Sequence, residues 1–182
     1  KMSKRKGIYF ALDDLIEEVG KDAVRFIFLS YAPNSHVNFD INLAKEHSEE
    51  NPVYYVQYAH ARISSIIKKF QSPSYKFRTA SKSKLQNQKT SLLVHPKEIS
   101  LIRELNKFPE LIEKIAKTYE VHSLAHYAIR LSDKFHSFYD QCKVIDESNS
   151  ELSIARLNLI KAVKIVLGET LRIMGIEAPE KM

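Results

Sequence analysis

The sequence contains little of what a turn-rich or cross-linked protein needs. Its 182 residues include four glycines, six prolines and one cysteine, Cys142. The scarcity of glycine and proline argues against a β-protein with many turns and favours long helices. A single cysteine excludes a framework of disulfides within the chain, and no cysteine–histidine cluster has zinc-site spacing. These shortages favour a helical protein of a reducing compartment, the cytoplasm.

Apolar runs of membrane length are also missing. No run approaches the roughly 20 residues that a membrane-spanning helix needs. The basic first residues are followed by the acidic stretch 12–22, which does not fit the apolar part of a secretory signal. Apolar residues still make up 44% of the chain, enough for a core. We therefore expect one main domain with no membrane partner.

Acidic residues are absent from one long window. Residues 51–97 contain nine Lys or Arg and no Asp or Glu, whereas the rest of the chain carries 19 basic and 22 acidic residues. The net charge of +6 therefore comes from this window. Positive charge segregated in this way suits a polyanion such as a nucleic acid. A basic, solvated surface without a ligand is the alternative.

Apolar spacing predicts helices in the first part of the chain. Short helices are expected within 11–50, and Gly20 is the stop signal of the first. A long helix should begin at Pro52 with Asn51 as its cap. Residues 71–91 are polar and basic with few aliphatic side chains, which is typical of a flexible insertion.

Every apolar pattern beyond the insertion is also helical. Residues 151–174 are apolar on almost all sides, as expected for the central helix of a bundle. The predicted fold class is therefore all-α: a helical bundle over about residues 50–176, preceded by a short helical segment.

One helix face carries the side chains best suited to bind RNA. Tyr55, Tyr58 and Arg62 recur at helical spacing, away from the apolar positions of the same helix. Tyrosine rings stack with unpaired bases, and arginine adds charge and a planar face. The structural alternative is a pair of half-buried tyrosines with their hydroxyls in water, which is common in bundles.

Other polar residues give weaker signals. His122 and His126 have a spacing that zinc tolerates, but no third ligand is evident, so we expect no metal site. Cys142 lies six residues after His136. A cysteine nucleophile needs a base positioned beside it, and the sequence places no such base there. Neither a glycine-rich phosphate loop nor a catalytic carboxylate pair is present. Nothing in 51–182 reads as a self-sufficient active site.

The chain opens with KMSKRKG. Lys1 and Lys4 flank a Met–Ser pair and can reach a polyphosphate together, because lysine is a compact charge on a flexible stem. In nucleotidyl transfer such cations stabilise the charge that develops on the leaving pyrophosphate. This stretch also resembles the KMSKS signature of class I aminoacyl-tRNA synthetases, with Arg5 in place of the final serine.

A longer stretch shows which family within this class the sequence resembles. NSHVNFDINLAKEHSEENPVYYVQYAHARI is similar to arginyl-tRNA synthetases where they enter the anticodon-binding domain. The similarity continues through FHSFYDQCKV and ARLNLIKAVKIVLGETLRIMGI to the terminal APEKM. It covers essentially the whole chain except 71–91.

The resemblance implies a C-terminal fragment of such an enzyme. Its parts would be a signature loop (1–10), a helical connecting segment (11–50) and a helical anticodon-binding domain (51–182) with a basic insertion (71–91). Enzymes of this family form arginyl-adenylate from arginine and ATP with Mg²⁺, then transfer arginine to tRNA(Arg). The HIGH signature and the nucleotide-binding fold are missing here, so the fragment should need no cofactor and activate no arginine.

Site residues follow from the same resemblance. Lys1, Ser3 and Lys4 would contact the ATP phosphates in the parent enzyme. The residues expected to bind tRNA are Tyr55, Tyr58, Arg62, Tyr139 and Met182. We expect a monomer. The competing expectation is a helical protein–protein interaction or structural module without RNA recognition, in which the tyrosines pack inside the fold.

Overall fold

The structure, a computed structural model, describes residues 11–71 and 90–182, and every regular element in these ranges is helical. The elements are α1 (Leu12–Val19), α2 (Lys21–Leu29), α3 (Ile41–Lys45), α4 (Pro52–Gln71), the 3₁₀ turn η3 (Thr90–Leu92), α5 (Pro96–Asn106), α6 (Phe108–Thr118), α7 (His122–Gln141) and α8 (Ser150–Ile173). The predicted all-α class is confirmed. The signature loop and most of the basic insertion lie outside the described residues.

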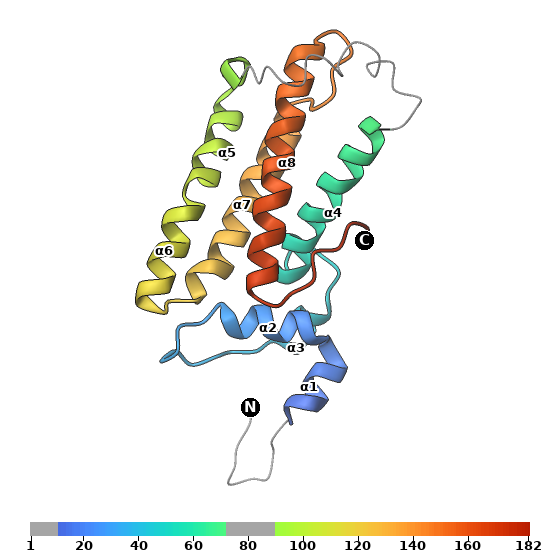
Figure 1. The fold of residues 1–182 in the computed structure, drawn as a ribbon. Coiled ribbons are helices and arrows are strands. Elements are labelled where there is room, and N and C mark those ends of the chain that lie inside the picture. Colours follow the sequence, from blue (N-terminus) through green and yellow to red (C-terminus); the bar gives the residue numbers. More distant parts are fainter. Residues whose placement is uncertain (1–10, 72–89) are drawn as a thin grey trace.

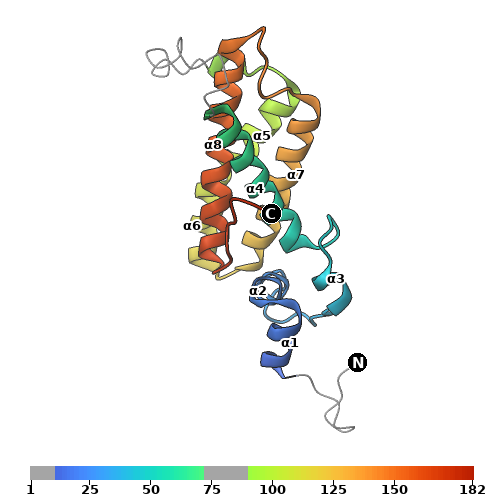
Figure 2. The same ribbon diagram turned by 90° about the vertical axis from the view of Figure 1, so that its right-hand side faces the viewer.

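The long helices stand side by side. Helices α4, α5, α7 and α8 run lengthwise and pack against one another, and α6 extends the line of α5 along α7 (Figure 1). Helix α2 packs across the lower ends of α4 and α7, and α1 contacts α2 and α3 below the bundle (Figure 2). The predicted order, a short helical segment followed by a bundle, is therefore observed.

Local signals mark the helix ends as expected. Gly20 ends α1 with φ 85, and its N–H donates to the carbonyl of Ile16 at 2.9 Å. The Oδ1 of Asn51 accepts the N–H of Val53 at 3.2 Å in the first turn of α4. The Asn51 amide also donates to the carbonyl of Glu46 at 2.8 Å, which ties the α3–α4 connection to the helix start. Both caps satisfy backbone groups that a helix end leaves unpaired.

The core lies where the long helices meet. Val56 and Ile63 of α4, Leu131 and Phe135 of α7 and Leu167 of α8 are all fully buried. Their positions follow the helical period, because residues three and four apart share a face. The bundle core therefore consists of apolar side chains that recur at helical spacing.

Helix α8 is less enclosed than its sequence suggested. It contacts α4, α5 and α7, as a central helix should. However, the side chains of Ile165 and Ile173 are 71% and 44% exposed. One side of α8 thus faces solvent, and the expectation of an apolar helix buried almost all round was too strong.

The turn after α8 gives a test of backbone conformation. Gly175 has φ +68, and a Cβ there would lie 2.6 Å from Nη2 of Arg25, whose Nε donates to the Met174 carbonyl at 3.0 Å. We expect Gly175→Ala to lower the free energy of unfolding by about 1–2 kcal/mol, through backbone strain and loss of that bond. Chemical denaturation measures this change in the free energy of unfolding. Gly20→Ala is the matched control, since Gly20 also has positive φ but no neighbour within 4 Å; equal losses would exclude a role for Arg25.

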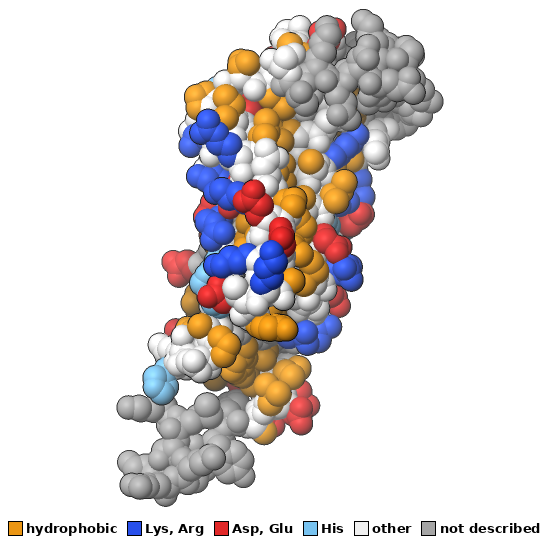
Figure 3. Space-filling view, turned by 60° about the vertical axis from the view of Figure 1, so that its left-hand side comes forward, with side chains coloured by type: hydrophobic (Ala, Val, Ile, Leu, Met, Phe, Trp, Pro, Cys, Tyr) orange, Lys and Arg blue, Asp and Glu red, His pale blue; other side chains and the backbone are white. Residues whose placement is uncertain are grey.

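The surface charge is not uniform around the molecule. On the face that Figure 3 shows, Lys and Arg side chains alternate with Asp and Glu. By contrast, the described part of the acid-free window includes all of α4.

Among the described residues, no helix is long and apolar enough to cross a membrane.

Candidate nucleic-acid interface

One cavity collects four of the five predicted tRNA-binding residues. Tyr58 and Arg62 come from α4, Tyr139 comes from α7, and Met182 comes from the segment after α8. The cavity has a volume of about 320 Å³ and is open to solvent. Its α4 wall holds Tyr58 and Arg62 together because residues four apart lie on one helix face. Tyr139 and Met182 reach it only through the packing of the bundle.

Arg62 lies between two tyrosine rings. Its guanidinium carbon is 5.6 Å from the centroid of the Tyr58 ring and 4.5 Å from that of the Tyr139 ring. One guanidinium nitrogen also donates to the Tyr58 hydroxyl. Partial burial by itself would lower the pKa of Arg62, but the two tyrosine hydroxyls outweigh it and raise this pKa. The guanidinium therefore stays charged while its planar face packs against aromatic rings.

One donor in this cluster has no partner. The Nε of Arg62 is buried and makes no hydrogen bond with the described residues. Buried donors are almost always satisfied in folded proteins, by the protein itself, by water or by a ligand. This Nε–H can reach an acceptor outside the protein only after the side chains around Arg62 rearrange.

The aromatic surface extends beyond the predicted residues. The ring of Tyr54 lies 6.2 Å from that of Tyr58, with the planes only 9° apart, and His47 packs edge-on against Tyr54 at 5.4 Å. Tyr54, Tyr58 and Arg62 thus follow one another at four-residue spacing along α4. That spacing was visible in the sequence, but the helix rotation that exposes Tyr54 on this side was not.

Tyr55 points toward α7 and does not line the cavity. Its hydroxyl donates to Oδ1 of Asp133 at 2.9 Å, and its ring lies 4.9 Å from His136. Burial and the Asp133 carboxylate raise its pKa. The Tyr58 ring also stacks against His136, with the ring centroids 6.0 Å apart. Tyr55 is therefore a neighbour of the cavity through His136, and its contact with tRNA remains a prediction.

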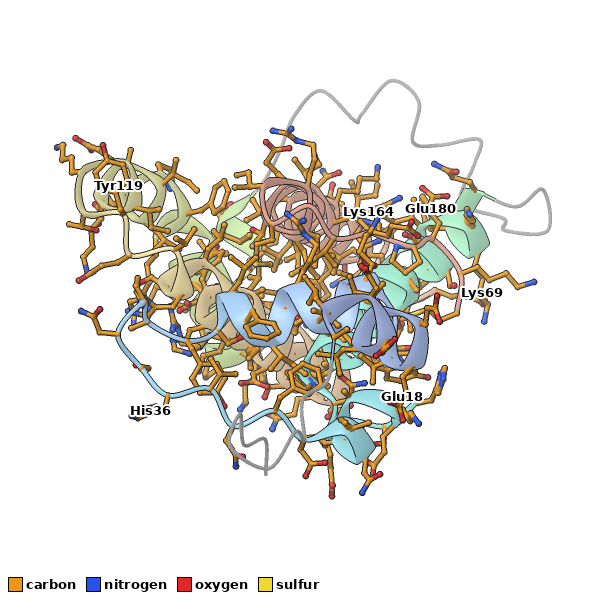
Figure 4. All side chains as sticks on the ribbon, turned by 90° about the horizontal axis from the view of Figure 1, so that it is seen from below. Glu18, His36, Lys69, Tyr119, Lys164 and Glu180 are labelled. Carbon is orange, nitrogen blue, oxygen red and sulfur yellow. The ribbon has the colours of Figure 1, made fainter. Side chains whose placement is uncertain are left out.

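Two lysines of α4 follow the aromatic cluster. Lys69 lines the cavity, and its side chain extends away from the molecule (Figure 4). Lys68 is paired with Glu180 at 2.7 Å. Because phosphate contacts supply most of the affinity for nucleic acid, an exposed lysine beside a stacking surface suits an RNA backbone.

Cys142 has a histidine neighbour that the sequence did not reveal. Its Sγ lies 3.3 Å from Nδ1 of His95, the residue that caps α5. The same nitrogen accepts the N–H of Lys97 at 3.2 Å, so it acts as an acceptor. Burial raises the pKa of the Cys142 thiol, which keeps it protonated. The pair is a partly buried hydrogen bond rather than an activated nucleophile.

Potential metal ligands do not gather in the described ranges. The rings of His122 and His126 lie 5.9 Å apart, but no group of three or more His, Cys, Asp or Glu that could hold a metal ion occurs in residues 11–71 and 90–182.

One buried histidine, His60, and one half-buried histidine, His136, predict an acid-sensitive fold. Burial lowers the pKa of both His60 and His136, and for His136 the charge of Arg62 adds to the effect. The unfolded chain then binds more protons than the folded chain as the pH falls through about 6.5, so stability is present above that pH and is lost below it. We expect a lower free energy of unfolding at pH 5.5 than at pH 7.5, measured with urea.

A variant tests which residue is responsible. His136→Gln should make the free energy of unfolding less dependent on pH, and His36→Gln, at an exposed position, is the matched control. Identical free energies at both pH values for the unmodified chain would contradict the assignment.

The architecture and the cavity define a class of protein. Residues 56–182 match the model of the DALR anticodon binding domain family, and the chain belongs to that family. Over all 182 residues it is 45% identical to the arginine–tRNA ligase of Dehalococcoides mccartyi and 50% identical to that of Geobacter metallireducens. In both comparisons the whole chain is covered, but it spans only 31% of the relative's length.

A solved structure agrees. The arginyl-tRNA synthetase from Plasmodium falciparum superimposes with a TM-score of 0.72 at 29% identity, over 93% of this chain and 28% of that one. The resemblance to arginyl-tRNA synthetases found in the sequence is therefore confirmed.

Proposed function

We propose that this chain is the tRNA-binding, C-terminal part of an arginine–tRNA ligase, and that its α4–α7 cavity holds an unpaired base of the anticodon loop. The observation that carries the proposal is the convergence of Tyr58, Tyr139 and Arg62 around one open cavity. Two rings and a guanidinium provide stacking, charge and hydrogen bonding together. A purely structural module would not require these side chains to meet at the surface.

The proposed roles of the chain segments follow the family. Residues 51–182 are the anticodon-binding unit, and 11–50 connect it to the catalytic part of the enzyme. In that enzyme, arginine and ATP form arginyl-adenylate and pyrophosphate, and the arginyl group then passes to the terminal adenosine of tRNA(Arg). Lys1, Ser3 and Lys4 would help to hold the ATP phosphates there, together with Mg²⁺. We place this reaction in the cytoplasm and expect a monomeric enzyme.

A binding experiment tests recognition. The 182-residue chain is titrated with a tRNA(Arg) transcript and with the same transcript carrying another tRNA's anticodon. Tighter binding to the first is expected, because the cavity contacts the anticodon bases. The affinity should also fall steeply with salt, by about 0.7 log units per log unit of salt for each phosphate contacted in a single strand. Equal affinity for the two transcripts would exclude recognition of the anticodon.

An activity assay tests the division of labour. We expect the 182-residue chain alone to catalyse no arginine-dependent exchange between ATP and pyrophosphate, because the proposal assigns that chemistry to the rest of the enzyme. Measurable exchange above a no-protein control would show that the chain contains an active site of its own.

A further inference from the structure

The segment after α8 folds back along the bundle. Met174 and Ile176 are almost fully buried, and Gly175 turns the chain between them. From there the segment runs alongside α4 and α8, as Figures 1 and 2 both show. We name residues 174–182 the return segment. It ends at Met182, which lines the cavity with Tyr58 and Arg62.

Buried and half-buried side chains hold the backbone of the return segment. The Nδ1 of His60 donates to the Pro179 carbonyl at 2.8 Å, and the Gln57 amide donates to the Glu177 carbonyl at 3.0 Å. The Asp22 carboxylate accepts the N–H of Glu177 at 3.1 Å. These contacts come from α2 and α4, so the path of the segment is tied to the bundle up to residue 179.

Glu180 makes the last anchor before Met182. Its two carboxylate oxygens pair with Lys68 of α4 and Lys164 of α8, each at 2.7 Å, and so bridge the two helices. Figure 4 shows Glu180 beside Lys164. These two lysines lower the pKa of Glu180 to about 2, so the carboxylate is charged at any physiological pH. Glu180 therefore links the return segment to α4 and to α8 at the same time.

Met182 depends on this anchor because it has little burial of its own. Its side chain is 51% exposed. Met182 is two positions beyond Glu180, and a chain of two residues reaches at most about 7 Å. With Glu180 fixed, Met182 is confined to the edge of the cavity; with Glu180 released, the nearest fixed point is the Pro179 carbonyl.

We propose that Glu180 is a positioning residue for RNA binding, because it clamps the return segment between α4 and α8 and so holds Met182 at the cavity. The proposal rests on the proposed function, since it names how one wall of that site is set. Charge alone predicts that removing an acidic residue beside Lys68 and Lys164 strengthens binding of a polyanion. The clamp predicts the opposite.

The first experiment measures affinity. We expect Glu180→Gln to weaken binding of an anticodon stem-loop of tRNA(Arg) about two- to tenfold, the range that ordering one side chain on binding produces. Glu180→Asp keeps the charge and should retain most of the affinity. Glu177→Gln is the matched control: it removes the same charge from the same segment, while only the backbone of Glu177 is engaged.

The second experiment needs no RNA. Methyl-¹³C methionine labelling reports the environment of Met182 by NMR, because nearby tyrosine rings shift its methyl signal. In Glu180→Gln this signal should move toward that of an unstructured methionine, whereas in Glu177→Gln it should stay in place. The midpoint of thermal unfolding should stay nearly unchanged in both, because exposed ion pairs contribute little stability.

The outcomes separate the clamp from the proposed function. Tighter RNA binding by Glu180→Gln would overturn the clamp and indicate that Glu180 competes with RNA phosphates for the two lysines. An unmoved Met182 signal would overturn it as well. Failure of the unmodified chain to bind the stem-loop would instead overturn the proposed function, and the NMR result would still decide whether Glu180 positions Met182.

Discussion

Replacing Glu98 with alanine is expected to lower the free energy of unfolding by about 3–5 kcal/mol. Glu98 is 1% exposed, and its carboxylate accepts the Nε–H of Arg156 at 2.6 Å and the backbone N–H of His95 at 2.8 Å. Truncation leaves a guanidinium that is only 12% exposed without its carboxylate and removes half of the α5 capping box. Breaking a buried pair costs more than the pair itself contributes, because the remaining charge stays desolvated.

Urea denaturation at neutral pH measures the effect. Glu113→Ala is the matched control, since Glu113 pairs with Lys117 on the surface of α6, where both side chains are about 70% exposed. The control should change stability by less than about 1 kcal/mol. If Glu98→Ala is as mild as the control, the buried pair does not hold α5 to α8 in the way its geometry indicates.

Replacing Tyr58 with alanine is expected to weaken binding of the tRNA(Arg) anticodon arm by about 1–3 kcal/mol, which is roughly five- to 150-fold in Kd. Tyr58 lines the cavity, and its ring contacts Arg62 and Tyr54. Its removal takes away a stacking surface and the acceptor of an Arg62 hydrogen bond. Fluorescence anisotropy with a labelled stem-loop measures the loss.

Two further variants identify the cause. Tyr58→Phe keeps the ring and should retain most of the affinity if stacking dominates. Tyr119→Ala removes a tyrosine that is 79% exposed at the turn between α6 and α7, and it should leave binding unchanged. Tyr58 is only half-buried, so Tyr58→Ala should cost less than about 2 kcal/mol of stability. A much larger loss would mean that this face of α4 belongs to the core.

Helix α4 shows which features the local sequence predicts and which depend on packing against the rest of the bundle. The sequence predicted where this helix begins, because Asn51 and Pro52 satisfy the backbone needs of a helix start by themselves. It also placed Tyr58 and Arg62 on one face, since a four-residue spacing has that consequence in any α-helix. Which tyrosine precedes them on that face, Tyr54 or Tyr55, depended on how α4 is rotated against α7.

The sequence by itself determined the all-α class, the main helices, the acid-free window and the family resemblance. These follow from the helical period, from capping chemistry and from charge, which act over a few neighbouring residues. The family resemblance had named Tyr139 and Met182 with Arg62, but it is the tertiary structure that places them in one cavity. The contacts of His95 with Cys142 and of Glu180 with its two lysines were decided by the tertiary structure alone. Such pairs depend on the angles at which helices pack and on the path of the return segment, and both are set by the shape of the whole core.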